Sequence, residues 1–106
     1  MTPEEILNVE KSIVLTLKNI YDPEIPVNIY DLGLIYEINY DPTGVADIIM
    51  TLTAPNCPMA DMLLEDIHRE VSKIDGVDKV NITLTFEPQW DKSMMTEEAM
   101  LVLNLF

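Results

Sequence analysis

Four things are scarce in this chain: cysteine, histidine, glycine and positive charge. Its 106 residues include one Cys, one His, three Gly and six Lys or Arg, against 19 Asp or Glu. A single cysteine cannot form an internal disulfide, which favours a reducing compartment such as the cytoplasm. With a formal net charge of −13, the chain lacks the clustered Lys and Arg that bind nucleic acids or anionic membranes. The sequence therefore predicts an acidic, cytoplasmic protein with neither nucleic acid nor membrane as a partner.

Long apolar runs are missing too, and we expect no signal peptide in the first residues. No apolar run approaches the roughly 20 residues that a transmembrane helix needs. The acidic residues 1–5 lack the basic-then-apolar layout of a signal peptide. A hydrophobic content of 48% without low-complexity tracts is typical of a folded protein. At this length we expect a single domain, residues 1–106, with one modest core.

Two segments have the apolar spacing of amphipathic helices. The first begins at a capping box made by Thr2 and Glu5, and it ends before Pro23. The second is expected from Pro58 to about Ile74, followed by Gly76 as the helix-ending residue. Their apolar stripes consist of Ile6, Val9, Ile13, Leu17 and Ile20, and of Met59, Leu63, Ile67, Val71 and Ile74.

Three segments alternate between apolar and polar residues, as half-buried strands do. Their predicted inward faces are Leu34, Tyr36, Ile38 and Tyr40; Ala46, Ile48, Met50 and Leu52; and Val80, Ile82, Leu84 and Phe86. The turn residues 41–44 join the first two strands in an antiparallel hairpin. Residues from Thr96 onward indicate one short final helix.

The order of elements predicts the fold class. It reads helix, strand, strand, helix, strand and short helix, which favours an α+β two-layer sandwich. The small sheet is expected to be mixed, with helices covering one face, because a strand–helix–strand crossover can create a parallel pair. The opposite face, rich in Thr and Asn, is either solvated or covered by a partner subunit.

The lone cysteine stands where the second strand gives way to the second helix. Pro58 suits the first helical position, so Cys57 falls at or beside the helix cap. Unpaired N–H groups and the helix dipole there favour a thiolate over a thiol. A lone cysteine is more often a small buried hydrophobe, but this position points to Cys57 as a functional thiol.

A second polar stretch, residues 22–33, is expected to fold back toward Cys57. The run 22–36, Asp-Pro-Glu-Ile-Pro-Val-Asn-Ile-Tyr-Asp-Leu-Gly-Leu-Ile-Tyr, together with 52–58, Leu-Thr-Ala-Pro-Asn-Cys-Pro, resembles the PaaD/SufT-type metal–sulfur (iron–sulfur) cluster assembly domain family. The likeness extends to Gly76-Val77 and to Trp90 with Met94 and Met95. The chain lacks the C-terminal cysteine cluster of PaaD proteins and the Cys-x-x-Cys pair of NifU-type scaffolds. The best fit is the short stand-alone version that accompanies the SUF machinery.

The resemblance implies a role in maturing iron–sulfur proteins, with assembly machinery and client apoproteins as partners. It also implies that Asp22, Glu24, Asp31 and Thr53 gather with Cys57 around one pocket. An iron–sulfur cluster normally takes several thiolates, so we expect no cofactor bound stably by a monomer. Transient iron or cluster binding would use Cys57 as a metal ligand shared with a client, a small thiol or the second subunit of a homodimer. Nearby carboxylates would raise the thiol's pKa and oppose the helix end, and the sequence leaves that balance open.

Two other functions stay open. A small thiol-dependent redox enzyme could act through Cys57, but such enzymes usually have a resolving cysteine or a basic partner. In a pure interaction module, Cys57 would be inert. We expect an assembly factor rather than a catalyst. Structural roles are expected for Asp31, holding its loop by an Asx-type bond, and for Trp90, covering one end of the core.

Overall fold

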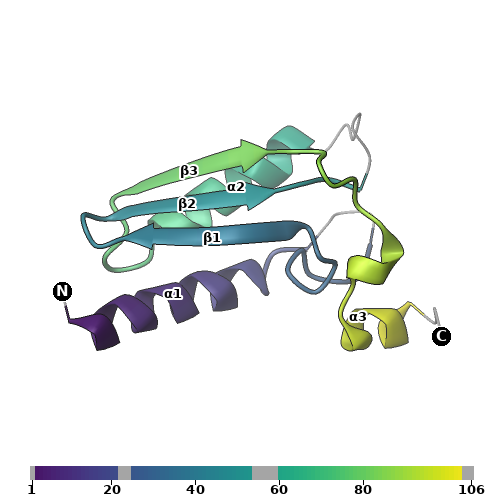
Figure 1. The fold of residues 1–106 in the computed structure, drawn as a ribbon, viewed down its shortest axis with the longest axis horizontal. Coiled ribbons are helices and arrows are strands. Elements are labelled where there is room, and N and C mark those ends of the chain that lie inside the picture. Colours follow the sequence, from purple (N-terminus) through teal and green to yellow (C-terminus); the bar gives the residue numbers. More distant parts are fainter. Residues whose placement is uncertain (1, 22–24, 54–59, 104–106) are drawn as a thin grey trace.

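The computed structural model describes residues 2–21, 25–53 and 60–103. The elements follow the predicted order (Figure 1): α1 (Pro3–Leu17), β1 (Ile35–Asp41), β2 (Val45–Met50), α2 (Ala60–Ser72), β3 (Lys79–Leu84), the 3-10 turn η1 (Lys92–Met94) and α3 (Glu97–Val102). The sheet has three strands in the order β1-β2-β3. Strand β2 runs antiparallel to β1 and parallel to β3. The predicted α+β fold with a small mixed sheet is confirmed.

The core lies between the helices and one face of the sheet. Along β2 the alternate residues Ala46, Ile48 and Met50 are fully buried, whereas Val45, Asp47 and Ile49 are half-buried. Only one face of the strand therefore meets the apolar stripes of α1 and α2. The same cluster contains, among others, Val9, Ile13, Leu17, Leu63, Ile67, Val71, Met95 and Ala99.

The helix boundaries follow their sequence signals. The Thr2 hydroxyl accepts a hydrogen bond from the Glu5 N–H at 3.1 Å, so the predicted cap is present. Helix α2 is described from Ala60 to Ser72, so it ends two residues before the predicted Ile74. Its predicted start at Pro58 lies outside the described residues. No helix in the described part of the chain is long and apolar enough to span a bilayer.

Two predicted strand faces are wrong in part. The register of β1 against β2 shifts between Ile35 and Glu37, so the expected alternation of Leu34, Tyr36, Ile38 and Tyr40 is interrupted. On the third predicted face, Ile82 is only half-buried, Leu84 at the end of β3 is 39% exposed, and Phe86 beyond it is 36% exposed. In the described part of the chain, β3 ends the sheet and has a neighbouring strand on one side only.

Candidate functional site

Residues 28–34 form one tight helical turn that is closed at both ends. At its start, the Asn28 side chain accepts from the Asp31 N–H and donates to Asp31 Oδ2, both at 2.8 Å. This pair resembles a capping box, in which side chains satisfy backbone groups at a helix start. The predicted structural role of Asp31 therefore has a physical basis in its bonds to Asn28.

The end of the same turn has the hydrogen bonds of a Schellman motif. The Leu34 N–H donates to the Ile29 carbonyl at 3.2 Å, and the Gly33 N–H donates to the Tyr30 carbonyl at 3.0 Å. Gly33 has a φ of +83°, a conformation that glycine adopts without steric cost. Ile29 and Leu34 are both fully buried, which anchors the turn in the core.

The C-terminal segment, residues 88–103, packs against this turn through hydrogen bonds and close contacts to backbone atoms. Trp90 Nε1 donates to the Leu32 carbonyl at 2.8 Å, and the Thr96 N–H donates to the Asp31 carbonyl at 2.9 Å. Gly33 lies against the Met94 backbone so closely that a Cβ there would fall 2.8 Å from the Met94 carbonyl carbon. The turn and the C-terminal segment therefore fold as one unit, although they are far apart in the sequence.

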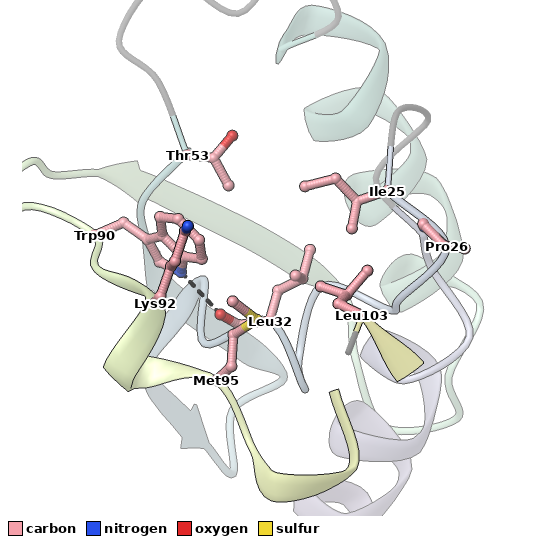
Figure 2. A pocket seen from close by; sticks show the side chains of 8 residues that line it. All are labelled: Ile25, Pro26, Leu32, Thr53, Trp90, Lys92, Met95 and Leu103. Carbon is pink, nitrogen blue, oxygen red and sulfur yellow. Dashed lines mark hydrogen bonds between the residues drawn. The ribbon is translucent and has the colours of Figure 1, made fainter. Parts of the chain in front are cut away.

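A pocket of about 440 Å³ lies between these two segments and the end of β2 (Figure 2). Most of its wall is apolar, and the side chains of Thr53 and Lys92 supply the polar groups. The close-up shows Trp90, Lys92 and Met95 projecting from the C-terminal segment. Its dashed line marks the hydrogen bond from Trp90 Nε1 to the Leu32 carbonyl. The lining residues are Ile25, Pro26, Leu32, Thr53, Trp90, Lys92, Met95 and Leu103.

Two of the predicted site residues belong to the described chain. Half-buried Thr53 lines the pocket of 440 Å³. Asp31 lines a smaller neighbouring pocket of about 120 Å³, and the two pockets share Pro26. Asp22, Glu24 and Cys57 lie outside the described residues, so their gathering around one pocket stays a prediction.

One described residue from each of the two stretches lines the same pocket. Ile25 belongs to residues 22–33, and Thr53 belongs to residues 52–58, which contain Cys57. Ile25 and Thr53, which are remote in sequence, both line the pocket of 440 Å³. Described parts of both stretches therefore lie at one pocket.

Sequence reasoning missed Lys92 and Leu103, and it expected Trp90 to cover one end of the core. These residues come from a segment whose contacts to residues 25–33 span long sequence separations, as in the Trp90–Leu32 bond with |i−j| of 58. Periodicity reports local structure and carries no signal for such a contact. The available clue was composition, because Lys92 is one of only six basic residues.

The described residues alone do not make a metal centre. Within residues 2–21, 25–53 and 60–103, no three His, Cys, Asp or Glu side chains come together in a group that could hold a metal ion. The described groups at the pocket are the Thr53 hydroxyl, the Lys92 ammonium and the Met95 thioether. Any iron handled here needs ligands from beyond this set.

Comparison with known proteins gives the family. A family model described as iron-sulfur cluster assembly protein matches residues 10–84, more than half of the chain. An Fe-S protein maturation auxiliary factor from Porphyromonas gingivalis is 56% identical over 100 residues, which cover 94% of this chain and 95% of that protein. The Fe-S protein maturation auxiliary factor SufT of Staphylococcus aureus is 31% identical over 86 residues, covering 81% of this chain and 98% of that protein.

A solved structure agrees with these sequence relationships. The crystal structure of a domain of unknown function from Bacillus anthracis superposes with a TM-score of 0.89 at 28% identity, covering 99% of this chain and all of that one, 100%. The resemblance carried by residues 22–36 and 52–58 is thereby confirmed. This chain belongs to the iron–sulfur cluster assembly protein family.

Proposed function

We propose that this protein is an iron–sulfur maturation factor that presents the Cys57 thiol beside the pocket for iron or cluster handling and for delivery to client apoproteins. The observation that carries the proposal is the shared pocket of Ile25 and Thr53, which belong to the two stretches of the family resemblance, residues 22–36 and 52–58. The names of similar proteins, Fe-S protein maturation auxiliary factors, support the same role.

Chain connectivity limits the position of Cys57. It lies four residues after Thr53 and three before Ala60, the first residue of α2. Because an extended chain spans at most about 3.6 Å per residue, the Cys57 Cα is within about 11 Å of the Ala60 Cα and about 14 Å of the Thr53 Cα. The chain between Thr53 and Ala60 is therefore long enough for the thiol to reach the pocket, as the proposal requires.

The pocket would give such a thiol a distinct environment. Its wall combines the apolar side chains of Ile25, Leu32 and Trp90 with the ammonium group of Lys92. A cation near a thiol favours the thiolate, which is the form that binds iron and attacks sulfur. Lys92 is exposed, so water and salt weaken this attraction without removing it. Lys92 thus opposes the effect expected from the carboxylates of Asp22 and Glu24.

One thiolate is too few for a stable cluster. Clusters are usually held by several cysteine thiolates, and this chain contributes only Cys57. The remaining ligands would come from the donor, a small thiol or the client, so cargo is held transiently and then passed on. Such an incomplete ligand set suits a protein that must release what it binds.

The test compares iron and sulfide content after anaerobic purification, together with maturation of an apo iron–sulfur enzyme. Cys57→Ala should abolish both, and Lys92→Met should weaken both by up to about fivefold, the size of one exposed charge contact. Lys11→Met is the matched control, because it removes the same charge from an exposed position on α1. Full maturation activity in Cys57→Ala would contradict the proposal.

A thiol-dependent redox enzyme is the second candidate, and Lys92 is the observation that favours it. Such an enzyme needs a basic group to stabilise its thiolate, and Lys92 lines the pocket with Thr53. The two functions separate in one comparison. If Cys57→Ala loses turnover of peroxide or disulfide substrates while client maturation persists, the protein is an enzyme.

A further inference from the structure

We propose that the outer side of α3, together with the adjoining Tyr21, docks a protein segment in which Lys or Arg stands beside apolar side chains. We call this surface, made of Tyr21, Glu98, Leu101 and Val102, the α3 surface. Helix α3 lies at the end of the molecule opposite the N-terminus (Figure 1). Binding at the α3 surface does not depend on the role of Cys57.

The α3 surface exposes large apolar side chains from two separate parts of the chain. Leu101 and Val102, in the last turn of α3, are 63% and 59% exposed, and Tyr21 is 56% exposed. Single exposed apolar residues are common in monomeric proteins, whereas contiguous ones mark interaction sites. Tyr21 and Val102 line the same small pocket of about 120 Å³, so these exposed side chains adjoin. The apolar surface therefore continues from one segment to the other.

Helix α3 places acidic and apolar residues together on its outer side. Ala99 is buried, and Met100 and Leu103 are half-buried against the core cluster. Residues four apart lie on the same face of a helix. The exposed residues of α3 form two such pairs, each an acid followed by an apolar residue: Glu97 with Leu101, and Glu98 with Val102. A partner that complements this face carries cations next to apolar side chains.

Tyr21 and α3 are held next to each other by a chain of hydrogen bonds. Tyr21 forms an antiparallel β-bridge with Asn28, whose side chain is bonded to Asp31. The Thr96 N–H donates to the Asp31 carbonyl at 2.9 Å, and the Thr96 hydroxyl accepts from the Ala99 N–H at 3.2 Å. A partner therefore meets a surface whose parts are already in place, which lowers the entropic cost of binding.

The charges at this surface favour a basic partner. Asp31 and Glu98 line the pocket of about 120 Å³, and no Lys, Arg or His of the described chain lines it with them. Both ion pairs found within residues 2–21, 25–53 and 60–103 lie in α2, so neither carboxylate at the pocket is paired with a cation there. The formal net charge of −13 also attracts a basic segment over a longer range and speeds its association.

The small pocket fits the end of one long basic side chain. At about 30 Å³ per water-sized group, its volume of about 120 Å³ is too small for a larger part of a partner. The alkyl stem of a Lys or Arg would lie against Tyr21 and Val102, and its charged head would lie near Asp31 and Glu98. Apolar side chains beside it in the partner would cover Leu101.

The first experiment measures, by fluorescence anisotropy, the binding of a labelled synthetic peptide that alternates Leu and Lys. The protein is the full chain with Cys57→Ala, so binding is tested apart from any thiol chemistry. Peptides that alternate Leu with Glu, or Ser with Lys, should bind at least about tenfold more weakly, because each lacks one of the two complementary features. Equal binding of the Leu–Lys and Ser–Lys peptides would show attraction to net charge alone and would overturn the proposal.

Matched variants test the surface itself. Glu98→Lys should weaken binding of the Leu–Lys peptide by about fivefold. Glu65→Lys changes the net charge equally at an exposed position on α2 and should have little effect. Leu101→Ser should also weaken binding by about fivefold, whereas Leu15→Ser, at a position on α1 that is 61% exposed, should not. Equal losses within either pair of variants would overturn the proposal.

Backbone amide chemical shifts show where the peptide binds. The amides that shift on addition of the Leu–Lys peptide should cluster at Tyr21, residues 26–31 and α3. The same spectra show whether α3 stays folded in each free variant. Val102→Thr keeps the shape of the side chain and repeats the apolar test if Leu101→Ser unfolds the helix. Peptide-induced shifts spread over α2, or absent from α3, would contradict the proposed surface.

Discussion

The two ends of this molecule are held together in different ways. The sheet body, made of α1, α2 and the three strands, is stabilised by apolar side chains that repeat at helical or strand periods. The site end, made of residues 25–34 and 88–103, contributes buried side chains to the same cluster, among them Ile29, Leu34 and Met95. It depends in addition on individual hydrogen bonds and close backbone contacts, such as Trp90 to Leu32 and Gly33 to Met94.

This difference predicts how each region fails. Loss of a core side chain should lower the stability of the whole domain, because the sheet and both helices share one cluster. Loss of a contact at the site end should open the pocket while most of the sheet body stays folded, since local regions unfold with their own free energies. The predictions below test that distinction.

The largest effect is expected from Ile48→Ala in β2. Ile48 is fully buried at the centre of the sheet, and removing a buried Ile side chain typically costs about 2–5 kcal/mol. Ile82→Ala is the matched control, because Ile82 is the parallel partner of Ile48 but only half-buried. Urea unfolding followed by circular dichroism should show a clearly smaller loss for Ile82→Ala. Equal losses would mean that burial does not set the cost in the sheet body.

A smaller effect, concentrated at the site end, is expected from Gly33→Ala. The positive φ of 83° costs an alanine about 1–2 kcal/mol, and the new Cβ would also press on the Met94 backbone. Gly44→Ala is the control, since Gly44 also has a positive φ of 106° but its Cβ would meet the exposed, movable side chain of Asp78. Hydrogen exchange should show faster opening of residues 90–103 in Gly33→Ala than in Gly44→Ala. Similar exchange in both variants would show that the Gly33–Met94 contact is dispensable.

Sequence reasoning succeeded where one element can be understood without its neighbours. The Thr2 cap, the apolar stripes of α1 and α2, and the alternation along β2 each follow from a local period, so their existence was predictable. The bulge in β1 was not, because a register shift depends on the partner strand. The exposure of Leu84 and Phe86 was missed for a similar reason, since a strand's own sequence does not say that it lies at an edge.

The candidate site was predictable in its family and not in its geometry. Residues 22–36 and 52–58 identified the family, and Thr53 does line the pocket. Half of the wall, however, comes from Trp90, Lys92, Met95 and Leu103, outside the 10–84 range that matches the family model. Their placement rests on contacts across more than half the chain, which no local pattern encodes.

A still smaller effect is expected from Trp90→Phe. The substitution keeps an aromatic ring and removes the N–H that donates to Leu32 at 2.8 Å. A hydrogen bond of this kind contributes about 1 kcal/mol, and an unsatisfied part-buried carbonyl adds to the cost. Binding of an environment-sensitive apolar dye should report a looser pocket. The control is Tyr36→Phe, which also removes hydrogen bonds to the C-terminal segment, from the Tyr36 hydroxyl to the Pro88 carbonyl and to Met94 Sδ. Neither Tyr36 nor these partners line the pocket. Equal dye binding by the two variants would show that the Trp90–Leu32 bond is not specifically needed for the pocket.

The smallest effect is expected from Asp41→Asn, in the hairpin turn of the sheet body. The backbone N–H and the hydroxyl of Thr43 both donate to Asp41 Oδ1 at 2.9 Å, and these bonds lower the pKa of the Asp41 carboxyl in the folded protein. A lowered folded pKa means that the unfolded chain binds more protons, so stability rises with pH between the two pKa values. The contribution is therefore complete above the unfolded pKa of about 3.9 and is lost as pH falls through the folded value.

Urea midpoints measured from neutral pH downward should be lower for Asp41→Asn than for wild type, with the gap closing at acidic pH. Asp75→Asn controls for removing one acidic charge at another exposed position near a turn. Because the Asp41 bonds are local to the sheet body, dye binding at the pocket should stay unchanged; a pocket that opens together with this turn would show that the two ends of the molecule are coupled after all.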